Sequence, residues 1–444
     1  MQDLLAGLRI LDCTTAVAMP TAMHLMSDMG AEIIKVESHT LNRDEMGPYV
    51  DNDPGEESWN HDATFHSLHR GKRSLTLNFK APESIKVFKE LIKVTDVMVE
   101  NNRAGTMDRL GLGYQELKKE NPALIYFSNT GFGHTGPWKR YAGIGSMLEL
   151  ISGLTQFTGY TDGTHHRVGA AWFDIHVAWM AIFAILSALE YRDETGKGQW
   201  VDFAMYQIGV ATIGDAILDY TVNGRNPNIM GNRHNSNAPH GTYPCKGDDK
   251  WVVFSIENEQ QWNSLRKVMG HPSWSDDPKY SDPLSRFHHQ DEMDKLLGEW
   301  TRGFEHNQLM QTLQENGVPA AAVMNTRELM TDPHMVARDF YERFRHSSES
   351  GIGTRAYVSR PWKMSKTPAF IHRSAPALGE ANEYVMDELL GWSEEDIARL
   401  YEMDVMAKEP ANQGTRKPAD LEGQLQKGIF AEIDPEYKKH LGYE

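Results

Sequence analysis

The sequence is poor in cysteine. Cys13 and Cys245 are the only two thiols in 444 residues, and they stand far apart in contexts that predict strand ends. Two distant thiols exclude the framework of a small disulfide-stabilised fold and give no thiolate metal site. The first residues, MQDLLAGLRILD, also lack the basic start and long apolar core of a signal peptide. We therefore expect a protein of the reducing cytoplasm.

Positive charge is also in short supply. Lysine and arginine together number 45 against 62 acidic residues, which gives a formal net charge of -17. This balance argues against nucleic acid or an anionic membrane as the main partner, although a local basic pocket could bind a polyanionic small molecule. The charge-free part of the longest apolar stretch is shorter than the ~20 residues that a bilayer span requires. We expect neither nucleic acid nor a membrane as a partner.

A glycine-rich dinucleotide motif is missing. Residues Leu8–Cys13 predict a strand, Thr21–Met29 a helix and Ala31–Glu37 a second strand, which together form a β-α-β unit. The connection after the first strand reads TTAVAMP and does not match GxGxxG. Because those glycines permit the close approach of a pyrophosphate, their absence argues against NAD or FAD.

A specific metal pattern is missing as well. His61, His66 and His69 lie close together, but their spacings of five and three residues, without a matched carboxylate, do not form a ligand set. The basic run RGKR follows, with Arg70, Lys72 and Arg73 leading into a strand. These cations could meet a phosphate or form a solvated surface patch, and composition does not distinguish the two.

The order of expected elements predicts an α/β fold. Strands and helices alternate up to about residue 133, which indicates an open, mainly parallel sheet with its ligand crevice at the carboxyl ends of the strands. Residues 223–242 are rich in Asn, Gly and Pro and predict a linker. We expect a large domain from residues 1–222, a small α+β domain at 243–332, and a return to the large domain over 333–444.

The sequence does contain a long apolar segment, and it surrounds a single carboxylate. Asp174 is the only charged residue in the segment VGAAWFDIHVAWMAIFAILSAL at 168–189. The apolar positions after it recur at the helical period, which predicts a helix with Asp174 at or just before its start. An N-cap role is the simplest interpretation, since an aspartate there is favoured by capping and by the helix dipole. Moving a carboxylate out of water nevertheless costs free energy, and a carboxylate found in an apolar segment despite this cost often has a function.

Several segments together resemble the class III CoA-transferase family, which includes formyl-CoA transferase and carnitine CoA-transferase. The segments are LAGLRILDCTTAVAMPTA, GAEIIKVE, RGKRSLTLNFK, VMVENNRAG, the block RVGAAWFDIHVAWMAIFAILSALEYRDETGKGQWVDFAM and GNRHNSNAPHGTY. The resemblance spans roughly residues 5 to 405. It implies a large Rossmann-like domain built from both chain ends, a small middle domain, and an interlocked dimer. It also implies coenzyme A as an acyl-CoA co-substrate, with no metal and no NAD.

The resemblance also assigns residues. The family's catalytic carboxylate falls at Asp174, and its CoA contacts fall at Ala16, Val17, Ala18, Lys72, Asn101, Arg109, Lys139 and Met205. Two positions depart from the family pattern: Ser38 replaces an arginine that helps to hold the nucleotide, and Val17 replaces a polar residue of formyl-CoA transferase. We therefore expect the basic residues from Arg70 to Arg73 to carry more of the phosphate binding.

The implied reaction moves CoA from an acyl-CoA donor to a free carboxylic acid through an aspartyl anhydride and an aspartyl-CoA thioester, with Asp174 as the nucleophile. Backbone N–H donors in the turns at 131–136 or 231–241 are candidates for oxyanion binding. Trp172 and Phe173 beside the nucleophile suit a bulky or aromatic acceptor, such as an aryl-substituted succinate, unless both rings merely pack in the core.

Two alternatives remain open. An α-methylacyl-CoA racemase needs an acid/base pair, and Ile144 occupies the position of its histidine. A non-catalytic CoA-binding subunit of a heteromer is the other alternative, and the presence of Asp174 argues against it. We expect a homodimer, or a heteromer with a related subunit.

Overall fold

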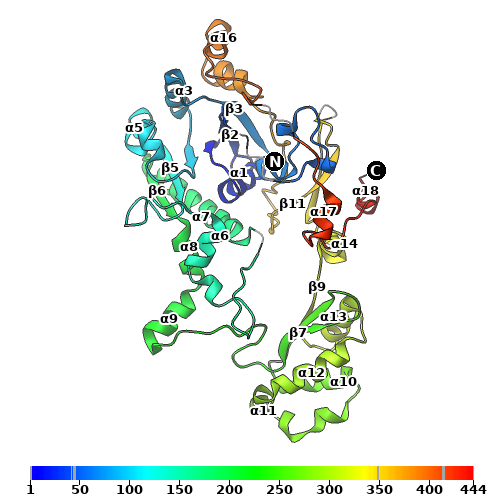
Figure 1. The fold of residues 1–444 in the computed structure, drawn as a ribbon. Coiled ribbons are helices and arrows are strands. Elements are labelled where there is room, and N and C mark those ends of the chain that lie inside the picture. The colour runs from blue at the N-terminus through cyan, green and yellow to red at the C-terminus, as the bar shows by residue number, and fades with distance from the viewer. Residues whose placement is uncertain are drawn as a thin grey trace. The chain divides into compact units, whose positions relative to one another are not determined.

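The computed structural model describes residues 3–41, 43, 47–169, 171–347, 350–412 and 416–443. The chain forms two compact units. Unit 1 consists of residues 1–154, 169–215 and 333–444, so both chain ends belong to it (Figure 1). Unit 2 consists of residues 155–168 and 216–332. The domain boundaries given above stay a prediction.

A six-stranded parallel sheet forms the centre of unit 1. Its strands are β1 (Arg9–Cys13), β2 (Glu32–Glu37), β3 (Lys72–Thr76), β4 (Val97–Glu100), β5 (Ile125–Thr130) and β6 (Trp200–Ala204). Their spatial order is β3-β2-β1-β4-β5-β6, and every neighbouring pair is parallel. The predicted α/β class with a mainly parallel sheet is confirmed.

Helices cover both faces of this sheet, because successive strand residues point to opposite sides. Ile10 of β1 packs with α1 (Ala18–Asp28) and α7 (Trp172–Thr195), whereas its neighbour Leu11 packs with α3 (Pro82–Ile92) and α16 (Glu394–Glu402). Both residues are fully buried. The sheet therefore lies between two apolar layers, and the second layer includes helices from the C-terminal part of the chain.

The α-helices up to residue 223 differ from prediction in two places. Besides α1, α3 and α7, they are α2 (Ala63–His69), α4 (Thr106–Arg109), α5 (Tyr114–Glu120), α6 (Gly145–Ile151), α8 (Met205–Thr212) and α9 (Gly214–Asn223). The single helix expected after Tyr206 is interrupted at Ile213, so that α8 and α9 are separate. The first helix, α1, begins at Ala18 rather than at Thr21.

The C-terminal part of unit 1 adds a hairpin and short helices. These are α15 (Pro333–Ala337), β10 (Tyr341–Arg345), β11 (Thr354–Val358), a π-helix at Tyr384–Leu389, α17 (Leu421–Gln426) and α18 (Tyr437–His440). The chain end is attached to the preceding part of the unit: the Lys438 ammonium donates to Asp51 at 2.8 Å, and Arg343 donates to the Gly442 carbonyl at 3.1 Å.

Unit 2 is built on a three-stranded antiparallel sheet of β7 (His240–Pro244), β8 (Trp251–Ser255) and β9 (Ala320–Val323). Its helices are α10 (Glu259–Val268), α11 (Pro283–His288), α12 (Gln290–Thr301), α13 (His306–Glu315) and α14 (Thr326–Thr331). β7 begins inside the segment that the sequence predicts as a linker. The expected strand at 251–255 and the helices near 258–268, 290–301 and 306–316 are present.

Candidate active site

The strand order places a crevice at the carboxyl ends of β1 and β4. From β1 the chain proceeds to β2 on one side, and β4 lies on the other, so the direction of the strand order reverses between these two strands. Connections leaving such a switch point diverge, and ligands of open α/β sheets bind in the gap between them. The residues that follow β1, β2, β4 and β5 are therefore candidates for substrate binding.

Two cavities lie at this edge of the sheet. One, of about 210 Å³, is lined by Asn101, Arg103, Lys139 and Gly131, among others. The second, of about 180 Å³, is lined by residues from the ends of β1, β2 and β4, which include Thr15, Glu37, Ser38, Arg43 and Asn102. The first cavity brings together two of the residues predicted to contact CoA, Asn101 and Lys139, and adds Arg103 as a further cation.

The other predicted contacts are distributed around these cavities. Ala16 is exposed with a positive φ of 66°, Val17 is half-buried, and Ala18 is buried as the first residue of α1. Arg109 is exposed and donates to the Thr106 hydroxyl, which lines the second cavity. Met205 is buried in the apolar core as the first residue of α8.

Lys72 is not among the residues that line the two cavities described above. Its side chain is fully buried, and its ammonium lies 2.8 Å from the Asp12 carboxylate and 3.1 Å from Nδ1 of His69. Although burial opposes ionisation of Asp12, Lys72 and Lys35 hold the pKa of this carboxyl below its usual value. The ion pair gives Lys72 a structural role inside the sheet, and its predicted contact with CoA stays a prediction.

The residues Arg70 to Arg73, which are expected to carry more of the phosphate binding, form ion pairs within unit 1. Arg70 is buried against Asp28 at 2.9 Å, and Arg73 lies 3.4 Å from Glu32, over the ring of Tyr384. Neither lines a cavity at the sheet edge. The basic run therefore fastens β3 to its neighbours through ion pairs.

Arg43 is a cation that sequence reasoning missed. Its guanidinium binds Glu37 through two hydrogen bonds, of 3.0 and 2.9 Å, and stacks at 3.8 Å over the ring of Phe65. It lines the second cavity beside Ser38. The stretch around Arg43 has no periodic pattern, and the only signal in the sequence is an arginine a few residues after the acidic end of β2.

Glu100 lies at the end of β4 beneath the first turn of the next loop. It is buried, and its carboxylate accepts a hydrogen bond of 2.7 Å from the backbone N–H of Asn102. Burial raises the pKa of Glu100 to about 7. The conformation of the loop that lines both cavities is thus tied to a carboxyl group that titrates near neutral pH.

Asp174 lies in the first turn of α7, but it is not the N-cap. The N-cap residue is Ala171, which makes no side-chain capping bond, and the helix begins at Trp172, so the predicted capping role is wrong. The position still suits a carboxylate, because the positive end of the helix dipole lies at the first turn. Asp174 is half-buried.

The carboxylate of Asp174 lies against the backbone of Gly145, the first residue of α6. A Cβ added to Gly145 would lie 2.3 Å from Oδ2 and 2.6 Å from Oδ1 of Asp174. Only glycine leaves room for this approach. Ile144, one residue earlier, is 62% exposed. The position beside Asp174 thus carries an aliphatic side chain where a racemase would need a titratable one.

The two aromatic neighbours of Asp174 differ in their surroundings. Phe173 is 2% exposed and belongs to the apolar core with Val177 and Phe127. Trp172 is 40% exposed and its ring stacks on that of His176, with centroids 5.7 Å apart. Of the two rings proposed to select an aromatic acid, Phe173 is therefore a core residue, and only Trp172 is open to a ligand.

The turn at 131–136 and the segment at 231–241 are the predicted candidates for oxyanion binding. Gly131 lines the first cavity, whereas the N–H of Gly133 is bound to the Thr130 hydroxyl at 2.8 Å. The segment at 231–241 belongs to unit 2. Gly131 is thus the member of this set that lies at the sheet edge.

α7 meets the length and composition of a membrane span, the one helix among the described residues that does so. Packing in the core explains the apolar composition of α7 without a bilayer, because Val177, Ala181 and Ile185 are fully buried beside α1. A core helix passes the same test. The described residues also contain no group of three His, Cys, Asp or Glu side chains placed to hold a metal ion.

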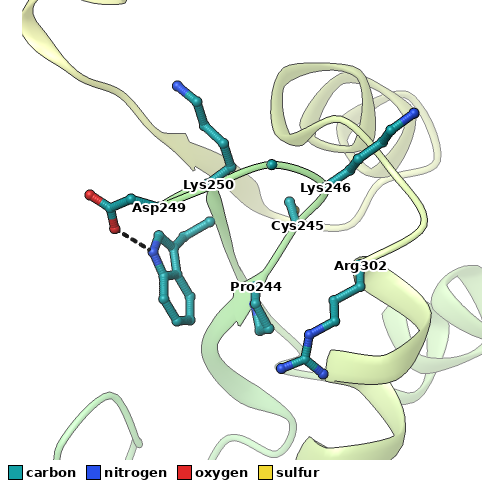
Figure 2. Close-up of a pocket in the computed structure, with 8 residues that line it drawn as sticks. Pro244, Cys245, Lys246, Asp249, Lys250 and Arg302 are labelled. Atoms are coloured by element: carbon teal, nitrogen blue, oxygen red, sulfur yellow. Dashed lines mark hydrogen bonds between the residues drawn. The ribbon is translucent and has the colours of Figure 1, made fainter. Parts of the chain in front are cut away.

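A further cavity lies in unit 2, around Cys245 (Figure 2). Lys246, Lys250 and Arg302 line it, but Figure 2 shows the two lysines pointing away from each other, and Lys250 pairs with Glu328 at 2.7 Å. Burial, together with the charge of Glu305, raises the pKa of the Cys245 thiol to about 11. The thiol is therefore protonated at neutral pH, and these groups do not converge on one reacting centre.

Comparison with known proteins matches most of this chain to one family. Residues 5–382 match the model of CoA-transferase family III. A succinyl-CoA–D-citramalate CoA-transferase from Chloroflexus aurantiacus is 33% identical over 401 residues, 89% of this chain and 96% of that protein. The beta subunit of a succinyl-CoA–L-malate CoA-transferase from the same organism is 31% identical over 89% of this chain and 96% of that one.

Among solved structures, a CAIB/BAIF family protein from Brucella suis superposes with a TM-score of 0.79. It is 30% identical in sequence, and the match covers 87% of this chain and 100% of that chain.

Proposed function

The chain belongs to CoA-transferase family III and is a CoA-transferase, and from this premise we propose that Asp174 is its nucleophile. The observation that carries the proposal is the placement of the Asp174 carboxylate in the first turn of α7, against the bare backbone of Gly145. The helix dipole favours the ionised form, which is the nucleophilic one.

The proposed reaction has four substitutions. The Asp174 carboxylate attacks the donor thioester, which gives a mixed anhydride and releases the CoA thiolate. The thiolate attacks the aspartyl carbonyl of the anhydride, which releases the donor acid and leaves an aspartyl-CoA thioester. The acceptor carboxylate attacks that thioester to give a second anhydride and the thiolate again. Attack of the thiolate on the acceptor carbonyl gives the new acyl-CoA and restores Asp174.

Acyl-CoA is the proposed ligand of the two cavities at the carboxyl edge of the sheet. Arg103 and Lys139 line the first cavity and are the cations that we expect to meet its phosphates, with exposed Arg109 nearby in sequence. The polar wall of the second cavity, formed by Glu37, Ser38 and Asn102, suits a nucleoside. Ala16, Val17 and Ala18 contribute backbone at the same edge. Lys72 supports this edge through its ion pair with Asp12, which in turn accepts from the Thr14 N–H.

For the acids, we propose succinyl-CoA as donor and a short dicarboxylic acid as acceptor. The support is the names of two relatives, which act on D-citramalate and L-malate with succinyl-CoA. An aryl-substituted acceptor has weaker support, because Phe173 is part of the core. The exposed ring of Trp172 would contact the variable part of either acid.

A homodimer is the proposed assembly. Within unit 1, helices α6 and α7 expose large apolar side chains, among them Met147, Leu150 and Phe183. Exposed apolar side chains of this size are typical of interfaces between subunits. One relative is named as a subunit, so a heteromer with a related chain is the alternative outcome of a light-scattering mass measurement. A cytoplasmic location stays a prediction.

The decisive experiment traps the covalent intermediate. The protein is incubated with a panel of acyl-CoA donors and free acids, treated with hydroxylamine or borohydride, digested and analysed by mass spectrometry. We expect modification at Asp174 and a loss of at least about 10³-fold in kcat in Asp174→Asn. Asp215→Asn is the matched control, since Asp215 is the acidic residue in the first turn of α9. Modification elsewhere, or none with any donor, would contradict the mechanism.

A further inference from the structure

The loop that follows β1 is held by side chains from β1, from β2 and from the residue after β4. Asp12 accepts from the Thr14 N–H at 2.9 Å and from its hydroxyl at 2.5 Å. Lys35 donates to the Thr14 carbonyl at 2.9 Å. Asn101 binds both backbone groups of Thr15: its Oδ1 accepts from the N–H at 3.0 Å, and its Nδ2 donates to the carbonyl at 2.8 Å. Two successive residues are thereby fixed.

Asn101 stands at the place where backbone pairing stops. The parallel pairing of β1 with β4 ends at Cys13 and Glu100, and Asn101 is the next residue. Its side-chain amide carries one acceptor and a donor group, the same pair of functions as a peptide unit. It therefore continues the ladder by one step beyond the last backbone pair. The turn is also held from within, because Glu100 accepts from the Asn102 N–H.

The step after Thr15 has an unfavourable conformation. Ala16 has a φ of 66°, in the left-handed region where a Cβ crowds the backbone. Residues other than glycine stay in this region only when their surroundings over-determine it. Val17 follows as the N-cap of α1 and makes no side-chain capping bond. The hydrogen bonds that hold Thr15 are therefore one determinant of the conformation of residues 16–18.

We propose that Asn101 is a positioning residue: by binding both backbone groups of Thr15 it holds Ala16 in the left-handed conformation and so presents the backbone of residues 16–18 to acyl-CoA. The inference rests on the proposed function, because it takes acyl-CoA as the ligand of this loop. It differs from a direct contact between the Asn101 side chain and CoA, since the amide acts through the loop.

Asn101→Ala tests the proposal, with Asn121→Ala as a matched control. The Asn121 amide also binds backbone, donating to the carbonyls of Ile92 and Thr95 and accepting from Ala123, but it precedes β5 at the opposite edge of the same sheet. We expect Asn101→Ala to raise the KM for acyl-CoA about five- to tenfold with kcat within about twofold, as the loss of one or two hydrogen bonds predicts. Asn121→Ala should leave both constants within about twofold.

A rescue distinguishes positioning from direct contact. Glycine adopts a positive φ without the cost that alanine bears. In an Ala16→Gly background, the KM ratio caused by Asn101→Ala should therefore fall below about threefold. An equal ratio in the two backgrounds would mean that Asn101 contacts the substrate itself and would overturn the proposal.

Hydrogen exchange tests the loop without any ligand. In the absence of CoA, the Thr15 and Ala16 amides should exchange at least about fivefold faster in Asn101→Ala than in the wild type, whereas Asn121→Ala should leave them unchanged. Unaltered exchange would overturn the positioning role. Failure of the wild type to bind acyl-CoA would instead overturn the proposed function, and the exchange result would still decide whether Asn101 holds the loop.

Discussion

Replacing Gly145 by alanine should disable the enzyme while leaving it folded. The new Cβ would lie 2.3 Å from Oδ2 of Asp174, whereas ordinary contacts of this kind begin at 3.4 Å, so the carboxylate must move by about 1 Å. A displacement of that size from the reactive geometry costs on the order of 100-fold in rate, or about 2.7 kcal/mol of barrier. Because Gly145 has no positive φ, alanine fits its backbone and is the better helix former.

The assay is an initial-rate measurement of CoA transfer with saturating donor and acceptor, combined with thermal unfolding of the same preparations. We expect kcat of Gly145→Ala to fall about 100-fold with an unchanged or slightly higher Tm. Gly214→Ala is the matched control: Gly214 is also the first residue of its helix, α9, and a Cβ there meets nothing within 4 Å. If Gly145→Ala keeps kcat within about threefold, the Asp174 carboxylate does not react from its position against Gly145.

Three further predictions concern the buried charges. Lys72→Met should lower the free energy of unfolding by about 3–5 kcal/mol in urea titrations, because it leaves the Asp12 carboxylate buried without its ion-pair partner. A loss below about 1 kcal/mol would contradict the structural role. Burial raises the pKa of Glu100 from 4.5 to about 7, so the folded state binds this proton more tightly than the unfolded state does. The free energy of unfolding should therefore fall as the pH rises from 4.5 to 7. Glu100→Gln should therefore be up to about 3 kcal/mol more stable than the wild type above pH 7 and equal to it below pH 4.5. Burial lowers the pKa of His66 and of His346 to about 4, so the free energy of unfolding should fall as the pH drops from 6.5 to 4. Unfolding measured at several pH values should show a smaller fall in His66→Gln.

The sheet could be predicted because its signals are local. Residues Val97–Glu100 form a strand as expected, and the alternation of Ile10 and Leu11 between two apolar layers follows from strand geometry alone. The same locality explains the exact match of β8 at 251–255. A short apolar run between turn residues specifies a buried strand without information from elsewhere in the chain.

The ion pairs of the basic run could not be predicted from sequence, because their partners are distant. Lys72 pairs with Asp12 sixty residues earlier, and Arg70 pairs with Asp28 forty-two residues earlier. Nothing near the RGKR segment indicates that these cations point into the sheet. Conversely, Arg43 lines a cavity but lies in a stretch without periodicity, where sequence reasoning has no element on which to place it.

The placement of Asp174 shows where local and tertiary determinants separate. The apolar period after Asp174 identifies the helix correctly, but the start of α7 is fixed by residues before it: the N–H of Ile175 donates to the Ala171 carbonyl, so Asp174 enters the first turn instead of capping it. An N-cap carboxylate turns back onto its own helix to accept from the backbone. In the first turn the dipole favours the charged form without requiring that contact.

The second determinant of the placement of Asp174 is Gly145, 29 residues earlier. Its neighbouring residues alone indicate a glycine in a turn. Its missing side chain is needed because a carboxylate of another helix lies against its Cα, and no single segment of the sequence contains that pair.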